Sequence, residues 1–188
     1  MKLSFATIAA ILVLVANVSY SIDIIRGRVK PHAYTWFIWS VVNGIVLGGQ
    51  YASGAGVGAI PTLINEILTV TNLVLALKWG YRSFKFIDHV FLAVAILGIL
   101  IWVITDDPTS AVILAVGIDL AAFVPTIRKT WENPGTETPL LFSANAVRHI
   151  FSLLSLEAYN VATTLHSVAM IATNSLMTFI IYFRKRKN

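Results

Sequence analysis

The chain of 188 residues contains no cysteine. This absence excludes structural disulfides and thiolate metal sites, although it does not assign a cellular compartment. Charged residues are also scarce, at 12% of the sequence, whereas 57% of the residues are hydrophobic. A water-soluble domain of this length cannot bury so much apolar surface, so the composition predicts an all-α membrane protein whose main partner is the lipid bilayer.

Apolar runs long enough to cross a hydrocarbon core of ~30 Å, at about 1.5 Å per residue, follow one another along the chain. The sequence predicts seven transmembrane helices, at residues 3–22, 34–52, 59–79, 88–105, 110–128, 138–156 and 161–183. Because these helices use nearly the whole chain, every connection is short. No stretch remains for a water-soluble catalytic or nucleic-acid-binding domain, and we expect no nucleic-acid partner.

Motifs for catalysis or for cofactor binding are also missing. The four histidines lie at scattered depths without a zinc-binding spacing such as H-E-x-x-H, and neither G-x-S-x-G nor a glycine-rich phosphate loop is present. We therefore expect no enzymatic activity, no cofactor and no metal site. A lipid-modifying enzyme that depends on Glu66 or His149 is the most distant of the functions that we consider.

The excess of positive charge, +5 overall, is distributed unevenly over the connections. The basic residues occupy alternate connections and the C-terminus, as Arg26, Arg28, Lys30, Lys78, Arg82, Lys85, Arg128, Lys129 and the segment Arg184–Lys187. The remaining connections carry no charge or only Asp106, Asp107 and Glu157. Because cytoplasmic loops are rich in Lys and Arg, this pattern predicts an outside N-terminus and a cytoplasmic C-terminus in the cell membrane, although Lys2 argues weakly against it.

The first three predicted spans match the last three. Pro31 aligns with Pro134 and Arg26 with Lys129, each in the basic connection after the first span of its unit. After a gap of one residue, Asn43 aligns with Asn145, Asn72 with Asn174 and Arg82 with Arg184. The first span therefore has a counterpart at 110–128, and we interpret it as an uncleaved helix rather than as a signal peptide.

The span at 88–105 has no counterpart. We interpret residues 1–86 as one three-helix repeat, residues 87–107 as a linker helix and residues 108–188 as a second repeat. An odd number of linking spans returns the second unit to the membrane in the orientation of the first. The predicted architecture is thus a 3+1+3 arrangement of parallel repeats.

This arrangement resembles the SWEET and PQ-loop superfamily of small transporters along essentially the whole chain, and a bacterial SWEET-like group most closely. The segment FVPTIRKTWENPGTETPL (123–140) is similar to a PQ-loop, with Pro125 at the place of the motif proline and Thr126 in place of the glutamine. The first repeat has Ile22 where its proline would stand. The resemblance implies that Asn72 and Asn174 face a substrate.

Independently of this resemblance, polar residues inside the spans recur at helical spacing. Trp36, Trp39 and Asn43 share a face of the second span, and Asn145, Arg148 and His149 share a face of the sixth. Aromatic rings and amides suit a small polar solute, because the rings cover its apolar surface and the amides replace its lost water. Alternatively, the amides hold helices together and Trp36 belongs to an interfacial aromatic belt.

We therefore expect a multi-pass carrier for a sugar-like or amino-acid-like solute that works by alternating access. A ligand-binding membrane receptor of the PQ-loop kind, without transport, is the alternative. Residues expected to couple or gate the cycle are Asp119, Arg148, His149, Glu66 and Pro125. The carboxylates and His149 favour a proton over sodium as a coupling ion, with facilitated diffusion as the other option. Homo-oligomerisation is left open.

Asp119 and Arg148 each lie about ten residues from the cytoplasmic end of a span, which places both roughly 15 Å deep. An unpaired charge at the centre of a spanning helix costs about 2.5–3.5 kcal/mol. We therefore predict that these two residues form an ion pair. Such a pair serves either as a static link between the fifth and sixth spans or in gating.

Overall fold

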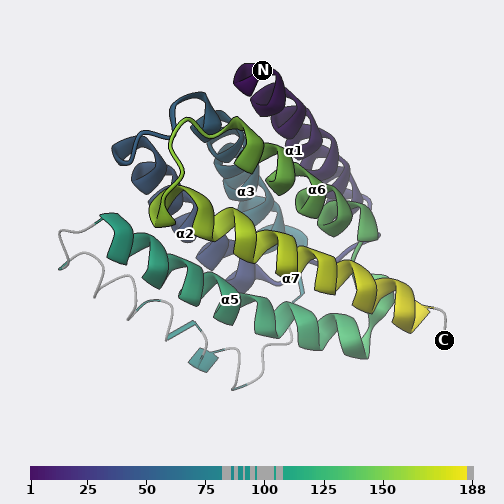
Figure 1. The fold of residues 1–188 in the computed structure, drawn as a ribbon. Coiled ribbons are helices and arrows are strands. Elements are labelled where there is room, and N and C mark those ends of the chain that lie inside the picture. The colour runs from purple at the N-terminus through teal and green to yellow at the C-terminus, as the bar shows by residue number, and fades with distance from the viewer. Residues whose placement is uncertain are drawn as a thin grey trace.

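The computed structural model describes residues 1–81 and 108–185, together with positions 86, 89–90, 92–93, 96 and 104. The described chain is helical and contains no strand beyond an isolated bridge between His32 and Tyr81. Its long helices are α1 (Lys2–Ile25), α2 (Ala33–Ala52), α3 (Ile60–Trp79), α5 (Pro108–Glu132), α6 (Pro139–Ser155) and α7 (Val161–Lys185) (Figure 1). Each of them overlaps one of the predicted spans. The predicted linker helix at 87–107 lies, apart from single positions, outside the described residues.

Proline and glycine mark the ends of several of these helices. Pro61 and Pro139 stand in the first turns of α3 and α6, where a missing N–H costs no intrahelical bond. Gly27, which adopts a φ of 70°, turns the chain just after α1. Short 3₁₀ helices, η1 (Gly56–Ala59) and η2 (Pro134–Thr136), precede α3 and α6.

Four segments of the described chain are long and apolar enough to cross a membrane. These are Lys2–Ile25, Gly56–Trp79, Thr109–Glu132 and Val161–Lys185. α2 has 20 residues and α6 has 17, and both carry several polar side chains. The composition-based prediction of an apolar helical protein is therefore confirmed for four helices.

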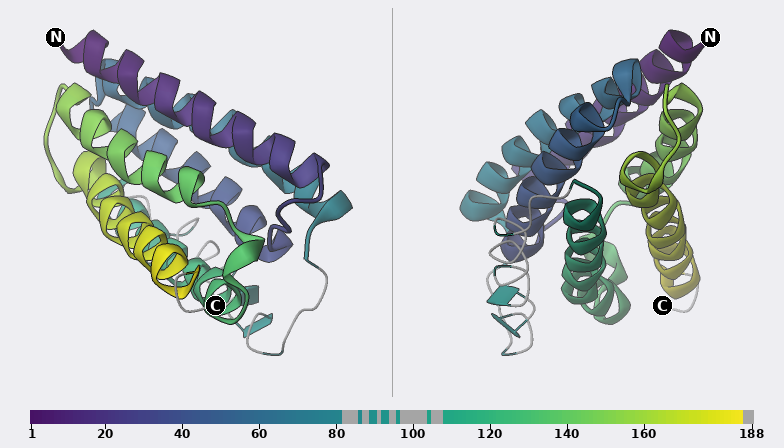
Figure 2. Two further views of the ribbon diagram at one scale, coloured as in Figure 1. Left: turned by 90° about the vertical axis from the view of Figure 1, so that its right-hand side faces the viewer. Right: turned by 60° about the vertical axis from the view of Figure 1, so that its left-hand side comes forward.

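The six long helices pack as a closed ring. Around the ring the order is α1, α3, α2, α5, α7 and α6, and α6 packs again on α1. The helices of the first half, purple to blue, lie on one side in Figure 2, and the green to yellow helices of the second half lie on the other. The two halves therefore meet mainly along two seams, α1 against α6 and α2 against α5.

The ring places polar side chains inside and apolar side chains outside. Its interior buries amide and ionisable side chains in the middle of helices, among them Asn17, Asn43, Asn65, Asn72, Asp119, Arg148, His149, His166 and Asn174. Its outer surface exposes Leu3 and Val15 on α1, Leu77 on α3 and Phe179 on α7. A protein folded in water has the opposite distribution, so this surface suits lipid.

The ends of the ring differ in charge. One end gathers the turns around residues 26–32 and 129–138 and the C-terminus of α7, which carry most of the described basic residues; we call it the basic end. The N-terminus, residues 53–59 and residues 156–160 meet at the opposite end. There the ammonium of Lys2 bonds the carbonyl oxygen of Leu156. The segregation of charge that the sequence predicted is thus present in the described residues.

Candidate functional site

A pocket lies inside the ring, with a volume of about 430 Å³ that includes the part open to the surroundings; we call it the cavity. All six long helices contribute to its wall, and the lining residues are Asn17, Trp36, Trp39, Asn43, Asn65, Thr69, Asp119, Phe123, Leu141, Phe142, Asn145, Arg148, His149, His166, Met170 and Asn174. The wall combines amides, ionisable groups and aromatic rings. Among the residues predicted to bind substrate, Asn43, Asn145, Trp36, Trp39 and Asn174 are brought together here.

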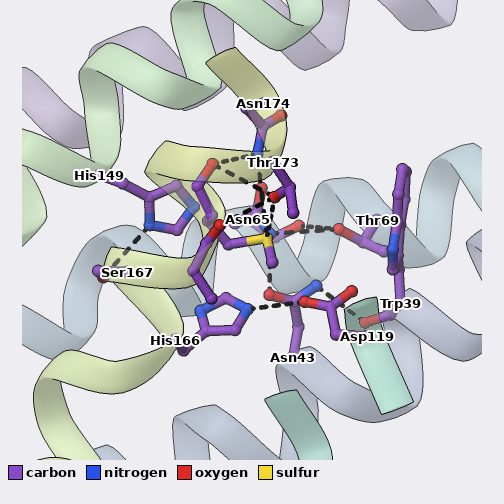
Figure 3. Close-up of polar contacts among 12 residues, drawn as sticks. Trp39, Asn43, Asn65, Thr69, Asp119, His149, His166, Ser167, Thr173 and Asn174 are labelled. Carbon is purple, nitrogen blue, oxygen red and sulfur yellow. Dashed lines mark hydrogen bonds and ion pairs between the residues drawn. The ribbon is translucent and has the colours of Figure 1, made fainter. Parts of the chain in front are cut away.

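Amide groups on the first half form one side of the cavity (Figure 3). Asn65 donates from Nδ2 to Oδ1 of Asn43 at 3.2 Å, and Asn43 donates to the carbonyl oxygen of Trp39 at 2.8 Å. The hydroxyl of Thr69 donates to the carbonyl oxygen of Asn65 at 2.8 Å. The periodicity of α2 therefore aims its polar face inward, as the sequence predicted, and α3 also turns a polar face inward.

Ionisable groups on the second half form the other side. Nε2 of His166 lies 3.2 Å from Oδ2 of Asp119, and both side chains are buried. Nδ1 of His149 lies 3.2 Å from Oγ of Ser167, and the rings of His149 and His166 are 5.5 Å apart. Arg148 donates from Nε to Oδ1 of Asn145 at 2.6 Å.

The prediction that Asp119 and Arg148 form an ion pair is wrong for this conformation. Asp119 is paired with His166, and Arg148 contacts a neutral amide. The reason is the order of helices around the ring, in which α7 lies between α5 and α6. The fifth and sixth spans are therefore not adjacent in the ring, and His166 on the intervening α7 contacts Asp119 instead.

Asn72 does not line the cavity. Its Oδ1 accepts a hydrogen bond of 2.6 Å from Ser21, and its Nδ2 donates to Oδ1 of Asn17 at 3.2 Å. Asn17 in turn lines the cavity, so Asn72 contacts the wall from behind. Its counterpart Asn174 lies on the wall itself and donates to the carbonyl oxygen of Met170 at 2.8 Å.

Two of the residues predicted to couple or gate also lie outside the cavity wall. Glu66 is half-buried on α3, and its Oε2 is buried without a hydrogen-bond partner. Pro125 is buried inside α5, where it removes one backbone donor from the helix. Next to that position, the hydroxyl of Thr35 donates to the carbonyl oxygen of Ala122 at 3.3 Å.

Several residues of the cavity wall were not predicted as site residues, and Asn17 and His166 are the most informative of them. Neither residue was among those predicted to bind the solute or to gate the cycle. An asparagine in the middle of a long apolar helix is itself a signal, because an amide in lipid requires a partner. His166 offered a comparable signal, as an ionisable residue inside the predicted span 161–183.

A buried ion pair closes the basic end beneath the cavity. Lys129 and Glu137 form this pair, each with 2% of its side chain exposed. Nζ of Lys129 also donates to the carbonyl oxygen of Lys30 at 2.9 Å, and the hydroxyl of Tyr20 donates to Oε2 of Glu137 at 2.9 Å. We call Tyr20, Lys129 and Glu137 the basic-end cluster.

Apolar side chains separate this cluster from the cavity. The ring of Tyr20 packs against the cavity-lining Trp36 at 5.3 Å between centroids. Leu141 and Phe142 belong to the same apolar core and also line the cavity. The basic-end cluster and this apolar layer therefore lie in series between the cavity and that end of the ring.

No protein-family model, no curated protein and no solved structure matches this chain.

Proposed function

We propose that the protein is a membrane carrier that moves a small polar solute by alternating access. The observation that carries this proposal is the cavity, which polar groups from all six long helices line inside a ring with an apolar outer surface. A polar cavity between helices at the middle of a membrane is where transporters bind their solutes. A purely structural role for so many buried amides and ionisable groups would not require empty space between them.

The proposed 3+1+3 architecture agrees with the packing of the ring. Exchanging α1 with α5, α2 with α6 and α3 with α7 converts every neighbouring pair in the ring into another neighbouring pair. This is what two repeats related by an axis along the membrane normal would produce. In addition, α3 ends at the basic end and α5 begins at the opposite end. The proposed linker would therefore connect the two ends of the ring, as a single span must.

Counterflow in proteoliposomes tests the proposal. Vesicles loaded with unlabelled sugars, amino acids or small carboxylates should accumulate the matching labelled compound from outside, because a carrier exchanges solute through a pocket that opens to both sides. Asn145→Leu should reduce this exchange about tenfold or more, since it replaces an amide of the cavity wall with an apolar side chain.

The matched control for Asn145→Leu is Val147→Leu. Val147 lies on the same helix but is 44% exposed on the outer surface, so its replacement should leave exchange unchanged. If a compound binds to the wild-type protein without exchanging, the protein is a receptor. If no compound binds or exchanges, the carrier proposal is wrong.

The proposed orientation places the basic end in the cytoplasm. Because the chain has no cysteine, single cysteines can be introduced without removing any native thiol. We expect Ser53→Cys, at the opposite end, to react with a membrane-impermeant maleimide in intact cells. Arg26→Cys, at the exposed turn of the basic end, should react only after permeabilisation. The reverse pattern would invert the proposed orientation.

A further inference from the structure

Arg148 is a buried cation whose protein partners leave most of its guanidinium unused. Only 4% of the residue is exposed, and it lies on the cavity wall. Its single hydrogen bond within the described chain runs from Nε to the neutral amide of Asn145. The two terminal amino groups of the guanidinium have no hydrogen-bond partner among the described residues.

A buried guanidinium of this kind requires a negative charge. Removing a cation from water is costly unless hydrogen bonds and an opposite charge compensate for it. Asp119 on the same cavity wall is close enough for its charge to act on Arg148, but its Oδ2 is held by His166 and no hydrogen bond joins it to the guanidinium. The amino groups of Arg148 are therefore free to bind an anion inside the cavity.

The other groups around the cavity are consistent with an anion. On α6 and α7 the titratable neighbours are His149 and His166, and on α5 the titratable neighbour is Asp119. The lining residues of α1, α2 and α3 are neutral amides, indoles and a hydroxyl. When the Asp119–His166 pair holds a proton between its two groups, the pair is neutral overall and Arg148 is the remaining charge.

The shape of the free donors selects the kind of anion. The terminal amino groups of a guanidinium form a flat fork that matches the two oxygens of a carboxylate. The aromatic rings of Trp39 and Phe123, 4.9 Å apart, offer an apolar surface in the same cavity. A carboxylate joined to a small organic body fits both features.

We propose that the solute is a small organic carboxylate, held by its carboxylate group on Arg148 and accompanied by one proton on the Asp119–His166 pair. The transport of this solute rests on the proposed carrier function, whereas its binding does not. Binding of the anion and the proton together leaves the cavity without a net charge, which lowers the cost of exposing it alternately to the two sides.

Thermal unfolding of the purified protein with matched compounds tests the binding. Propionate and lactate should raise the unfolding temperature, because a ligand of the folded state stabilises it. Propionamide and lactamide have nearly the same size without the charge, and we expect them to bind at least about tenfold more weakly. The carboxylates should also bind more tightly as the pH is lowered, since the proposed site takes up a proton with them.

Variants at Arg148 add a second readout. Arg148→Gln should abolish the difference between acid and amide, whereas Arg148→Lys should retain part of it because the positive charge remains. Arg26→Gln, which removes an exposed cation from the basic end, should leave the difference unchanged. If Arg148→Gln does not fold, the comparison of acid and amide on the wild-type protein still decides the question.

Three results would overturn the carboxylate site. These are equal stabilisation by acid and amide, equal stabilisation by sodium chloride at the same ionic strength, and binding of alanine without binding of propionate. The proposed carrier function fails separately. If carboxylates bind but show no counterflow, the carboxylate site is supported and the carrier function is wrong. If glucose alone shows counterflow, the carrier function is supported and the carboxylate site is wrong.

Discussion

Replacing either member of the Lys129–Glu137 pair alone is expected to lower the free energy of unfolding by about 3–5 kcal/mol. Both side chains are 98% buried, so each single replacement leaves an uncompensated charge in the interior. Glu137→Gln would leave the Lys129 ammonium with the carbonyl oxygen of Lys30, and Lys129→Met would leave the Glu137 carboxylate with the hydroxyl of Tyr20. Neither remaining group carries an opposite charge.

The double variant Lys129→Met with Glu137→Gln should recover most of this loss, because it removes both charges. Unfolding in a denaturing detergent series measures the three variants and gives the coupling energy between the two residues. If the double variant loses the sum of the two single losses, the residues do not act as a pair.

The Arg28–Asp23 pair provides a matched control at the same end of the ring. It also joins a basic residue to a carboxylate, but 54% of the Arg28 side chain is exposed. Arg28→Gln should therefore cost no more than about 1 kcal/mol, as is usual for pairs in contact with water. A loss as large as that of Lys129→Met would show that burial is not the cause.

Asp119→Asn is expected to remove the response of uptake to an imposed pH gradient. Under the proposed proton linkage, Asp119 and His166 hold the proton that accompanies the solute, and an amide cannot exchange it. Uptake driven by an inward proton gradient should fall about tenfold or more, whereas counterflow at equal pH should persist, since exchange needs no net proton movement. Uptake and counterflow in the same vesicles separate the two effects.

A static role for the Asp119–His166 pair predicts a different result. In that case Asp119→Asn combined with His166→Gln should restore both folding and gradient-driven uptake, because no charge remains to be compensated. Thr178→Ala is the control on α7, since its hydroxyl bonds only the carbonyl oxygen of Asn174 on its own helix. If the wild-type protein shows no response to a pH gradient, proton linkage is wrong and facilitated diffusion remains.

The helical spacing of polar and aromatic residues predicted which face of α2 and of α6 lines the interior. Asn43 and Trp39 on α2, and Arg148 and His149 on α6, lie on one cavity wall as their spacing indicated. Periodicity works here because the side chains of one helical face must point in one direction. It assigns a face to each helix, but it contains no information on which helix that face will meet.

The pairing of Asp119 with His166 shows that limitation. Counting residues placed Asp119 inside a span and so predicted that it has a partner, but the choice of partner required the order of helices around the ring. The basic-end cluster was missed for a related reason. Glu137 lies in the connection before α6, and the path of that connection brings it to Lys129 and Tyr20. Basic residues near membrane surfaces usually stay in water, so Lys129 was interpreted only as a signal of orientation.

If the two halves are repeats, the four ionisable residues of the cavity have no ionisable counterparts. In the alignment of the halves, Asp119, Arg148, His149 and His166 fall on Ala16, Val46, Leu47 and Ile64. A pair of identical three-helix chains could build the same ring, but it would duplicate every charge and crowd like charges in one small space. When both halves belong to one chain, one half can carry the ionisable residues and the other can supply neutral amides. A symmetric dimer of identical chains cannot have this asymmetry.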